Sequence, residues 1–387
     1  AQYHVLPCSA MPAAAAAQTS YRIFYQILIY LNMINPESRT REWIESLHKQ
    51  YPYIKDASLL EKTIRAFSLL ESLVRSGCPF IFKGGTALML HLGSSRRLSI
   101  DIDIVCKPGT NVWDYLECYA GEYGFTGVKE ISRKSRTDVP KSHAAYKYLV
   151  SYPAGYSSGE ILLDVLYEDI DYAHVLTLPI ESPLLKNEGE PVLVQIPSLE
   201  DMLGDKLTAF APHTTGIPFY KNGKPFSMEI MKQLFDVSSI LDRINNLEIV
   251  NRTFQELVPI ELGYRGLNTL APQYVLKDAY ETAMNICLYG ALNKQEYNYL
   301  VDGAHRVNGF ILIENYTMER AVRDAAKLAY LVRLMELGIN EVSHYAKEAD
   351  TALADILIEN QALNKLNRIK KINTEAFFYC HQLEKLL

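Results

Sequence analysis

The chain has 387 residues, of which 48% are hydrophobic and 22% are charged, and its net charge is −6 at pH 7. This length exceeds the size at which a single hydrophobic core usually keeps growing, so it predicts two domains. The acidic balance excludes a protein that binds nucleic acid through its overall charge, and such a partner would need a local basic patch. No apolar run approaches the roughly 20 residues that span a bilayer, which indicates a soluble protein.

The six cysteines are scattered without C-x-x-C spacing. This pattern favours a reduced, cytoplasmic compartment and indicates neither a disulfide framework nor a zinc site. Residues 1–20 contain an alanine run but no basic segment of the kind that begins a signal peptide. We therefore treat residues 1–20 as a flexible or vector-derived lead outside the fold.

Apolar spacing and helix-capping residues predict the N-terminal elements. Ser58 and Glu61 have the spacing of a capping box, and the apolar stripe that follows them stops at Gly77. In chain order, the expected elements are a helix over 21–34, a helix over 58–77, a strand over 79–83, a glycine turn with a helix to about 93, a strand through Asp101 and Asp103, and a helix capped by Asn111 that runs to about 123.

Strands continue through the middle of the chain and then give way to helices. The expected elements are strands over 145–152, 160–166 and 192–196, a helix over 199–210 capped by Ser198, a loop over 212–225, and helices over 228–241, 280–292, 318–337 and 345–372. Because no strand is expected beyond about residue 246, we predict an α/β domain over 21–246 and a helical bundle domain over 247–387.

Asp101 and Asp103 are the strongest chemical signal in the sequence. Residues two apart in a strand project to the same face, so the two carboxylates stand side by side while Ile102 points into the core. A divalent metal with oxygen ligands is the usual partner of such a pair. Upstream, Gly84 and Gly85 let the backbone approach a phosphate at a helix N-terminus. A metal and a phosphate in one place indicate nucleotidyl transfer, whereas an exposed strand edge and a plain turn are the alternatives.

Other candidate residues carry weaker signals. Asp164 lies within an apolar strand, where a carboxylate needs a cation or metal, so it is a candidate third carboxylate or else a buried ion pair. Lys206 and Asp236 lie on expected helices, where spacing alone is typical of solvated or packed side chains. The basic window over 129–147 is either a solvated face or an RNA contact.

These motifs together resemble a known family. The run Lys83-Gly84-Gly85-Thr86-Ala87-Leu88 with Arg97-x-Ser99-x-Asp101-Ile102-Asp103 resembles the first motif of AbiEii/AbiGii-type toxins, which are nucleotidyltransferases of the DNA polymerase β-like superfamily that includes the MenT toxins. Three further stretches are similar to the second, third and fourth motifs: Leu163-Asp164-Val165, Asp205-Lys206-Leu207-x-Ala209 and Lys232-x-x-x-Asp236. The four motifs occur in the right order over residues 81–240.

The resemblance implies a polymerase β-like core with a small mixed sheet and flanking helices. It also implies roles for individual residues. Asp101, Asp103 and Asp164 would hold Mg²⁺ or Mn²⁺, Lys206 would contact the phosphates of an NTP, and Asp236 would be an essential site residue. The residues that would line the triphosphate are Gly84, Gly85, Thr86, Arg97 and Ser99. The sequence departs from the family at Pro212 and His213, because the family often places an arginine soon after the lysine helix.

The resemblance implies a toxin that transfers a nucleotide from an NTP by in-line attack on the α-phosphate, with release of pyrophosphate. By family analogy, the acceptor is an RNA such as the 3′ end of tRNA, and a cognate antitoxin protein is the partner. Two alternatives remain open. One is nucleotidyl transfer to a small molecule or a protein, and the other is a non-catalytic protein that binds a nucleotide or a partner in the same cleft.

Overall fold

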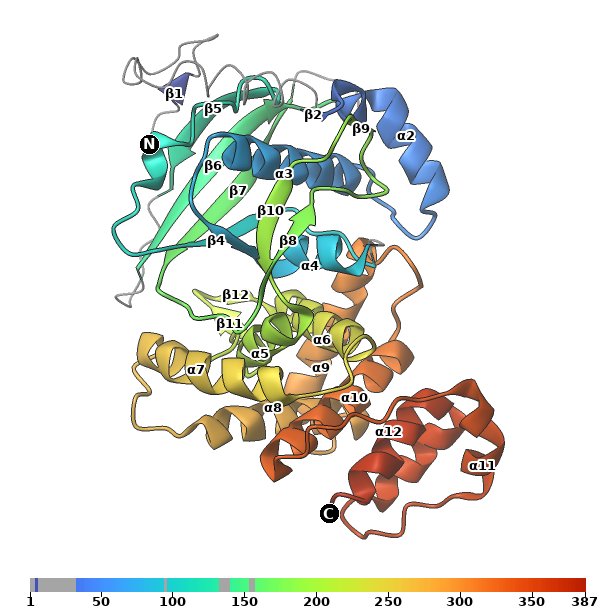
Figure 1. The fold of residues 1–387 in the computed structure, drawn as a ribbon. Coiled ribbons are helices and arrows are strands. Elements are labelled where there is room, and N and C mark those ends of the chain that lie inside the picture. Colours follow the sequence, from blue (N-terminus) through green and yellow to red (C-terminus); the bar gives the residue numbers. More distant parts are fainter. Residues whose placement is uncertain (1–3, 6–32, 94–95, 132–139, 153–156) are drawn as a thin grey trace. The chain divides into compact units, whose positions relative to one another are not determined.

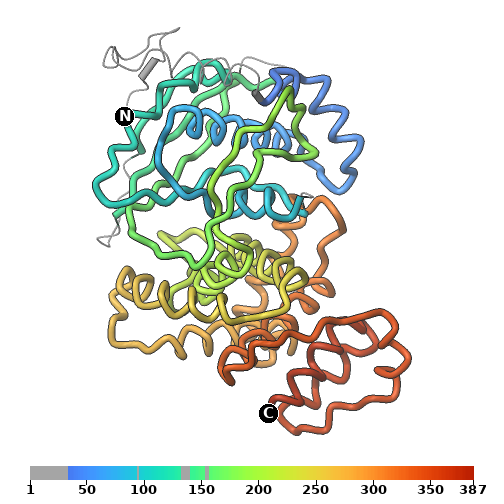
Figure 2. The backbone as a smooth tube through the Cα atoms, viewed as in Figure 1, coloured from blue at the N-terminus to red at the C-terminus, as the bar shows by residue number. Residues whose placement is uncertain are grey.

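The computed structural model describes residues 4–5, 33–93, 96–131, 140–152 and 157–387. Contacts divide the chain into two compact units, and the smoothed backbone in Figure 2 follows each of them. Unit 1 comprises Ala1–Asp171, Val175–Pro197 and Phe310–Glu314. Unit 2 comprises Tyr172–His174, Ser198–Gly309 and Asn315–Leu387. The division therefore falls at Ser198, whereas the sequence analysis placed the boundary near residue 246.

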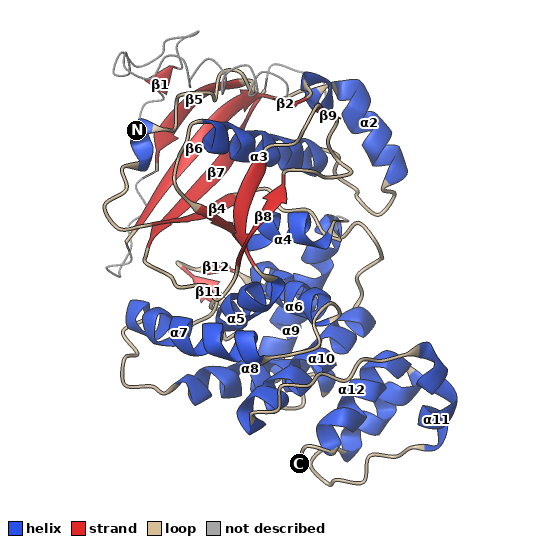
Figure 3. Cartoon of the chain, in the orientation of Figure 1, coloured by secondary structure: helices blue, strands red, loops and turns tan. Residues whose placement is uncertain are grey.

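A six-stranded mixed sheet organises the described part of unit 1 (Figures 1 and 3). Its order is β1-β5-β6-β7-β4-β3, in which β4 and β7 are parallel and the other neighbours are antiparallel. The strands are β1 (His4–Val5), β3 (Ile81–Lys83), β4 (Ile102–Cys106), β5 (Phe125–Glu130), β6 (Lys141–Leu149) and β7 (Ser158–Tyr167). This arrangement confirms the predicted mixed α/β class. Because β1 pairs with β5, part of the expected lead belongs to the sheet.

Helix α3 (Ser58–Arg75) packs on the sheet through its buried apolar stripe, which includes Leu60, Ile64 and Phe67 (Figure 1). The predicted capping box is wrong. Ser58 is already the first helical residue, and its N–H donates to Oδ1 of Asp56 (2.9 Å). The Glu61 carboxylate instead accepts from the N–H of Ser151 (2.9 Å), because a long-range loop takes the place of the local cap.

The remaining elements of unit 1 surround this core. They are β2 (Met33–Ile34) paired with β9 (Asn187–Glu188), η1 (Pro36–Arg39), α2 (Arg41–Gln50), α4 (Gly84–Leu92), η2 (Val112–Asp114), and β8 (Val175–Pro179) paired with β10 (Leu193–Pro197). The helix expected over 21–34 lies outside the described residues up to residue 32, and Met33–Ile34 form a strand. Three basic residues of the window over 129–147 also lie outside the described residues: Arg133, Lys134 and Arg136.

Helices dominate unit 2. They are α5 (Leu199–Ala209), α6 (Ser227–Leu241), α7 (Glu248–Tyr264), α8 (Pro272–Cys287), α9 (Lys294–Val307), η3 (Asn308–Phe310), α10 (Met318–Leu337), η4 (Lys347–Ala349), α11 (Asp350–Asp355), η5 (Asn364–Lys371) and α12 (Thr374–Glu384). Helix α10 packs against α6, α8 and α12, while α5 packs against α7 and α6 against α9. These contacts explain why α5 and α6 group with the C-terminal helices. None of the helices in the described part of the chain has the length and apolar character that crossing a membrane requires.

The predicted helix from Asn111 to residue 123 is wrong. Only the short η2 forms there, and the amide of Asn111 donates to Asp114 (2.8 Å) instead of capping a helix. Beyond η2, the backbone makes successive turns, and the Arg75 guanidinium lies 4.5 Å from the ring centre of Tyr119 and 5.6 Å from that of Tyr123. These tertiary contacts outweigh the local helical spacing.

The single helix predicted over 345–372 is also wrong, because the chain is extended at Ile356 after the six-residue α11. The side chain of Asn367 accepts from the N–H of Ile358 (2.9 Å) and donates to its carbonyl oxygen (2.9 Å). This asparagine therefore satisfies loop backbone that a helix would have satisfied internally.

The segment expected to be a loop over 212–225 ends in a short hairpin. Its strands are β11 (Tyr220–Lys221) and β12 (Lys224–Pro225), which pair antiparallel. Residues 212–219 form turns and bends without a helix or strand, as the sequence predicted. The guanidinium of Arg265 steadies this part, because its Nη2 donates to the carbonyl oxygens of Thr215 (3.0 Å) and Gly216 (3.1 Å).

Candidate active site

The turn from β3 into α4 brings backbone close to a carboxylate. Gly84 has a φ of +82°, in the left-handed region that favours glycine, and a Cβ at this position would overlap Oδ2 of Asp103. Only glycine therefore lets the carboxylate lie against the start of α4. The first N–H groups of a helix have no intrahelical acceptor, so this turn offers donors to an anion such as a phosphate.

Four neighbouring strands place one polar residue each in a row across the sheet. Lys83 of β3 lies opposite Asp103 of β4, and Asp103 lies beside Asp164 of β7. Asp164 in turn lies opposite His143 of β6, with Oδ1 of the aspartate 2.6 Å from Nδ1 of the histidine. Residues paired in register share a face of the sheet, so the two carboxylates stand between a lysine and a histidine.

Asp101 and the first turn of α4 are tied together. Asp101 precedes β4 by one residue and is partly exposed, whereas Ile102 is fully buried, as the predicted alternation requires. The buried hydroxyl of Thr86 donates to the carbonyl oxygen of Asp101 (2.7 Å). The Thr86 hydroxyl thus anchors this acidic segment, and its backbone N–H is the donor best placed to serve a ligand.

Arg97 and Ser99 lie against Gly85 on the same turn. A Cβ at Gly85 would lie 2.7 Å from Oγ of Ser99 and 2.8 Å from Nη2 of Arg97, so glycine is needed here for space. Arg97 is only 7% exposed, and its Nη1 donates to the carbonyl oxygen of Leu98 (3.0 Å). The structure therefore brings a guanidinium and a hydroxyl to the same helix start as the two glycines, in agreement with their predicted grouping.

The carboxylates suit a hard divalent cation. Mg²⁺ is usually bound through one or two carboxylates and completes its coordination with water and substrate phosphates. Asp103 and Asp164 supply carboxylates from adjacent strands, and the space left by the missing Gly84 side chain borders one of them. Among the described residues, no three His, Cys, Asp or Glu side chains stand close enough to hold a metal by themselves. The donor set thus fits a metal that shares its coordination with a nucleotide.

In unit 2, Lys206 of α5 and Asp236 of α6 form a buried ion pair. Nζ of Lys206 lies 2.7 Å from Oδ2 of Asp236, and the residues are 7% and 1% exposed. Burial at the α5–α6 contact makes this pair unlike a solvated surface pair. The predicted site residues therefore divide between the two units, with the three acids in unit 1 and this pair in unit 2.

Asp201, an acid one turn before Lys206, is structural. It is fully buried and accepts hydrogen bonds from the N–H groups of Ala173 (2.9 Å) and His174 (3.0 Å) and from the hydroxyls of Ser198 (2.7 Å) and Thr253 (2.6 Å). The Ser198 hydroxyl also caps α5, as the sequence predicted. These bonds satisfy the carboxylate within unit 2, so Asp201 has a packing role.

His213 is held as a cation in unit 2. Its Nδ1 lies 2.8 Å from Oδ1 of Asp278 and its Nε2 lies 3.0 Å from Oε1 of Glu296. Hydrogen bonding to Asp278, helped by Glu296 and opposed by partial burial, raises the pKa of His213 to about 9. This residue occupies the sequence position near which the related family often has an arginine, and it carries the same sign of charge.

The stability of unit 2 should depend on this charge. Because the folded pKa of His213 lies above the unfolded value of about 6.5, its contribution to stability is complete below about pH 6.5. It is lost as the pH rises through about 9. In urea unfolding, the difference between wild type and His213→Gln should shrink between about pH 6 and about pH 10. A difference that stays constant over this range would contradict the assignment.

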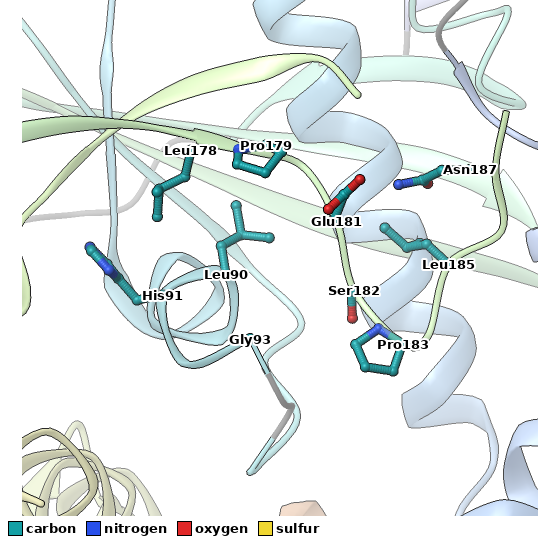
Figure 4. A pocket seen from close by; sticks show the side chains of 10 residues that line it. All are labelled: Leu90, His91, Gly93, Leu178, Pro179, Glu181, Ser182, Pro183, Leu185 and Asn187. Carbon is teal, nitrogen blue, oxygen red and sulfur yellow. The ribbon is translucent and has the colours of Figure 1, made fainter. Parts of the chain in front are cut away.

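A cavity of about 550 Å³ also lies within unit 1, but at the other end of α4 (Figure 4). Leu90, His91 and Gly93 border it from the C-terminal end of that helix, and Leu178 and Glu181 border it from β8 and the segment after it. Gly84 lies at the N-terminal end of the same nine-residue helix. The cavity is therefore distinct from the glycine turn and the acidic row.

The match to a known family follows this geometry. The sequence model of the nucleotidyl transferase AbiEii toxin family, a Type IV toxin–antitoxin system, matches residues 68–300, which is more than half of the chain. The chain belongs to the AbiEii family. The family resemblance expected from the four motifs is thus confirmed, and the matched region includes the glycine turn, the acidic row and the Lys206–Asp236 pair. No curated protein gives a match to this AbiEii family sequence.

Sequence reasoning missed two residues of the row. His143 lacks any metal-binding spacing, and the strand predicted over 145–152 began two residues after it, so its side chain was not assigned to the sheet. Lys83 was recognised as part of the motif but was given no role. Both become visible only when the register of β3, β4, β6 and β7 is known.

Proposed function

We propose that this AbiEii family member is a metal-dependent nucleotidyltransferase that moves a nucleotide from an NTP to an RNA acceptor such as the 3′ end of tRNA. The observation that carries the proposal is the acidic pair Asp103 and Asp164 in adjacent strands, beside a helix that begins at Gly84. A metal site next to a phosphate-binding helix start is what transfer of a phosphoryl-linked group requires.

Each part of the proposed site has a chemical task. Asp101, Asp103 and Asp164 would hold Mg²⁺ or Mn²⁺, which when bound stabilises charge on the attacking and leaving oxygens. A hydroxyl of the acceptor attacks the α-phosphorus, the bond to pyrophosphate breaks, and the hydroxyl proton passes to solvent. His143 would hold the Asp164 carboxylate in position, since the two side chains are hydrogen-bonded.

The triphosphate would be bound by donors gathered at the start of α4. These are the backbone of Gly84, Gly85 and Thr86 together with the side chains of Arg97 and Ser99. A guanidinium and a helix N-terminus favour phosphate oxygens through charge and through directed hydrogen bonds. Lys206 would contribute a further cation to the phosphates, with Asp236 holding its ammonium in place.

The wider setting is proposed from the family. The core would be polymerase β-like, and the helices of unit 2 would include a C-terminal bundle. A cognate antitoxin protein would oppose the toxin, in keeping with the Type IV toxin–antitoxin description. The cytoplasm is the proposed compartment, because cysteines scattered without paired spacing suit a reducing environment.

The experiment is to incubate the purified protein with each labelled NTP, Mg²⁺ and total RNA, and to resolve the products on a gel. Labelled RNA of tRNA size is expected with at least one NTP and should disappear when a chelator is added. Label on a small molecule or a protein would favour the first alternative. Nucleotide binding without transfer to any acceptor would favour the non-catalytic alternative.

Two glycine variants separate crowding of the carboxylate from backbone strain. Gly84 and Gly93 both have positive φ, but a Cβ at Gly93 would have no atom within 4 Å, whereas one at Gly84 would displace Asp103. Each Gly→Ala variant should lose about 1–2 kcal/mol of stability from left-handed strain. Only Gly84→Ala should also lower nucleotide incorporation, by at least about tenfold. Equal incorporation by the two variants would show that Gly84 does not shape the site.

A further inference from the structure

The β11–β12 hairpin of unit 2 carries side chains that the proposed chemistry does not use. Its turn is Asn222–Gly223, with φ values of +53° and +74°, which is the two-residue turn that suits a twisted hairpin. A two-stranded hairpin is marginally stable alone, so contacts with α9 must support it. The Tyr220 ring packs edge-on against Tyr299 of α9, with ring centres 4.9 Å apart.

The hairpin holds two like charges directly opposite each other. Lys221 and Lys224 are register partners, both are exposed, and neither is in an ion pair among the described residues. Like charges at such a position destabilise a strand pair. A polar pair would avoid this cost, so an anion that lies between the two ammonium groups gives the arrangement a purpose.

An aromatic surface adjoins the two lysines. Tyr220 is 45% exposed, and the ring centre of Phe219 lies 6.3 Å from that of Tyr299. The amide of Gln295 donates to the Tyr299 hydroxyl (3.0 Å), which steadies the supporting ring. The nearby carboxylate of Asp302 lies 3.7 Å from Arg306, so its charge is partly balanced. The surface therefore combines a stacking face with a cationic pair.

We propose that this hairpin binds the single-stranded part of the RNA acceptor, with a base on Tyr220 and a backbone phosphate between Lys221 and Lys224. Stacking of bases on aromatic side chains, combined with cations along the backbone, is how proteins hold single strands without reading sequence. This inference rests on the proposed function, because it assigns the acceptor of that reaction to a surface of unit 2.

The test uses the full chain and a fluorescein-labelled single-stranded RNA of about 12 nucleotides, a length within the site sizes of single-strand binders. Binding is followed by fluorescence anisotropy at several salt concentrations, without NTP or Mg²⁺. The variants are Tyr220→Ala, Tyr220→Phe and Lys221→Gln/Lys224→Gln. The controls are Tyr274→Ala, at a tyrosine that is 55% exposed on α8, and Lys277→Gln/Lys347→Gln, at exposed lysines outside the hairpin. Circular dichroism checks that each variant is folded.

Tyr220→Ala should weaken RNA binding about tenfold, whereas Tyr220→Phe, which keeps the ring, should bind within about twofold of wild type. The double lysine variant should reduce the slope of log K against log salt by about 1.4, since each single-strand phosphate contact contributes about 0.7. The control variants should leave both quantities unchanged. Unchanged binding by the folded hairpin variants, or equal losses in the controls, would overturn the inference.

Two further outcomes separate this inference from the proposed function. If a glutamate-rich peptide displaces the RNA as well as unlabelled RNA does, the hairpin is a site for an acidic protein and the inference fails. If the hairpin variants lose RNA binding but wild type transfers no nucleotide to any RNA, the hairpin assignment holds and the proposed reaction fails. Labelled-NTP incorporation and RNA anisotropy are therefore measured on the same preparations.

Discussion

Asp103→Asn is expected to abolish nucleotide incorporation while leaving the fold intact. Asparagine has nearly the same shape, so the contact with Gly84 is kept, but the charge that would hold a divalent metal is removed. A metal ion supplies several kcal/mol of transition-state stabilisation. A loss of about 4 kcal/mol corresponds to a rate about 10³-fold lower. The measurement is the initial rate of label transfer from NTP to RNA.

The matched control is Asp169→Asn, which removes an exposed carboxylate just beyond the end of β7. This variant should keep wild-type activity, because Asp169 lies outside the acidic row. The unfolding midpoints of both variants should stay within a few degrees of wild type, a shift of about 1 kcal/mol or less. If Asp103→Asn incorporates nucleotide at the wild-type rate, the row is not catalytic and the proposed function fails at its centre.

The sequence predicted the site best where chemistry and local pattern agree. Asp101 and Asp103 alternate with buried isoleucines, and the glycines upstream sit at a helix start, as expected. Strand β7 was expected from its apolar run around Asp164. What could not be predicted is that Asp103 and Asp164 are register partners, since parallel pairing joins distant segments and leaves no local signal.

The same limit explains the residues that were overlooked. His143 meets Asp164 only because β6 pairs with β7 in one register, and a shift by one residue would turn its side chain to the other face. Lys206 and Asp236 were each expected in the site, but their direct contact depends on how α5 packs on α6. Long-range packing therefore decides which of the predicted residues become partners.

The Lys206–Asp236 pair is expected to contribute to both stability and activity, and a double-mutant cycle separates the two. Removing one member of a buried pair leaves an uncompensated charge, which costs about 3–5 kcal/mol. Lys206→Met and Asp236→Leu should each lose stability on this scale. The double variant should recover most of it, because two apolar side chains can pack where the ions were. Urea unfolding measures these differences.

Activity should follow a different pattern in the same three variants. If Lys206 binds the phosphates of the NTP, the double variant stays inactive although its stability returns, because the cation is absent from both. A purely structural pair would regain incorporation along with stability, and that result would remove Lys206 from the site. Lys327→Met provides the control. Lys327 is also a buried lysine of unit 2, paired with Asp242 and Glu375 at 2.6 Å each, but it lies outside the four motifs. Its loss should destabilise the fold and leave the rate of nucleotide incorporation per folded molecule unchanged.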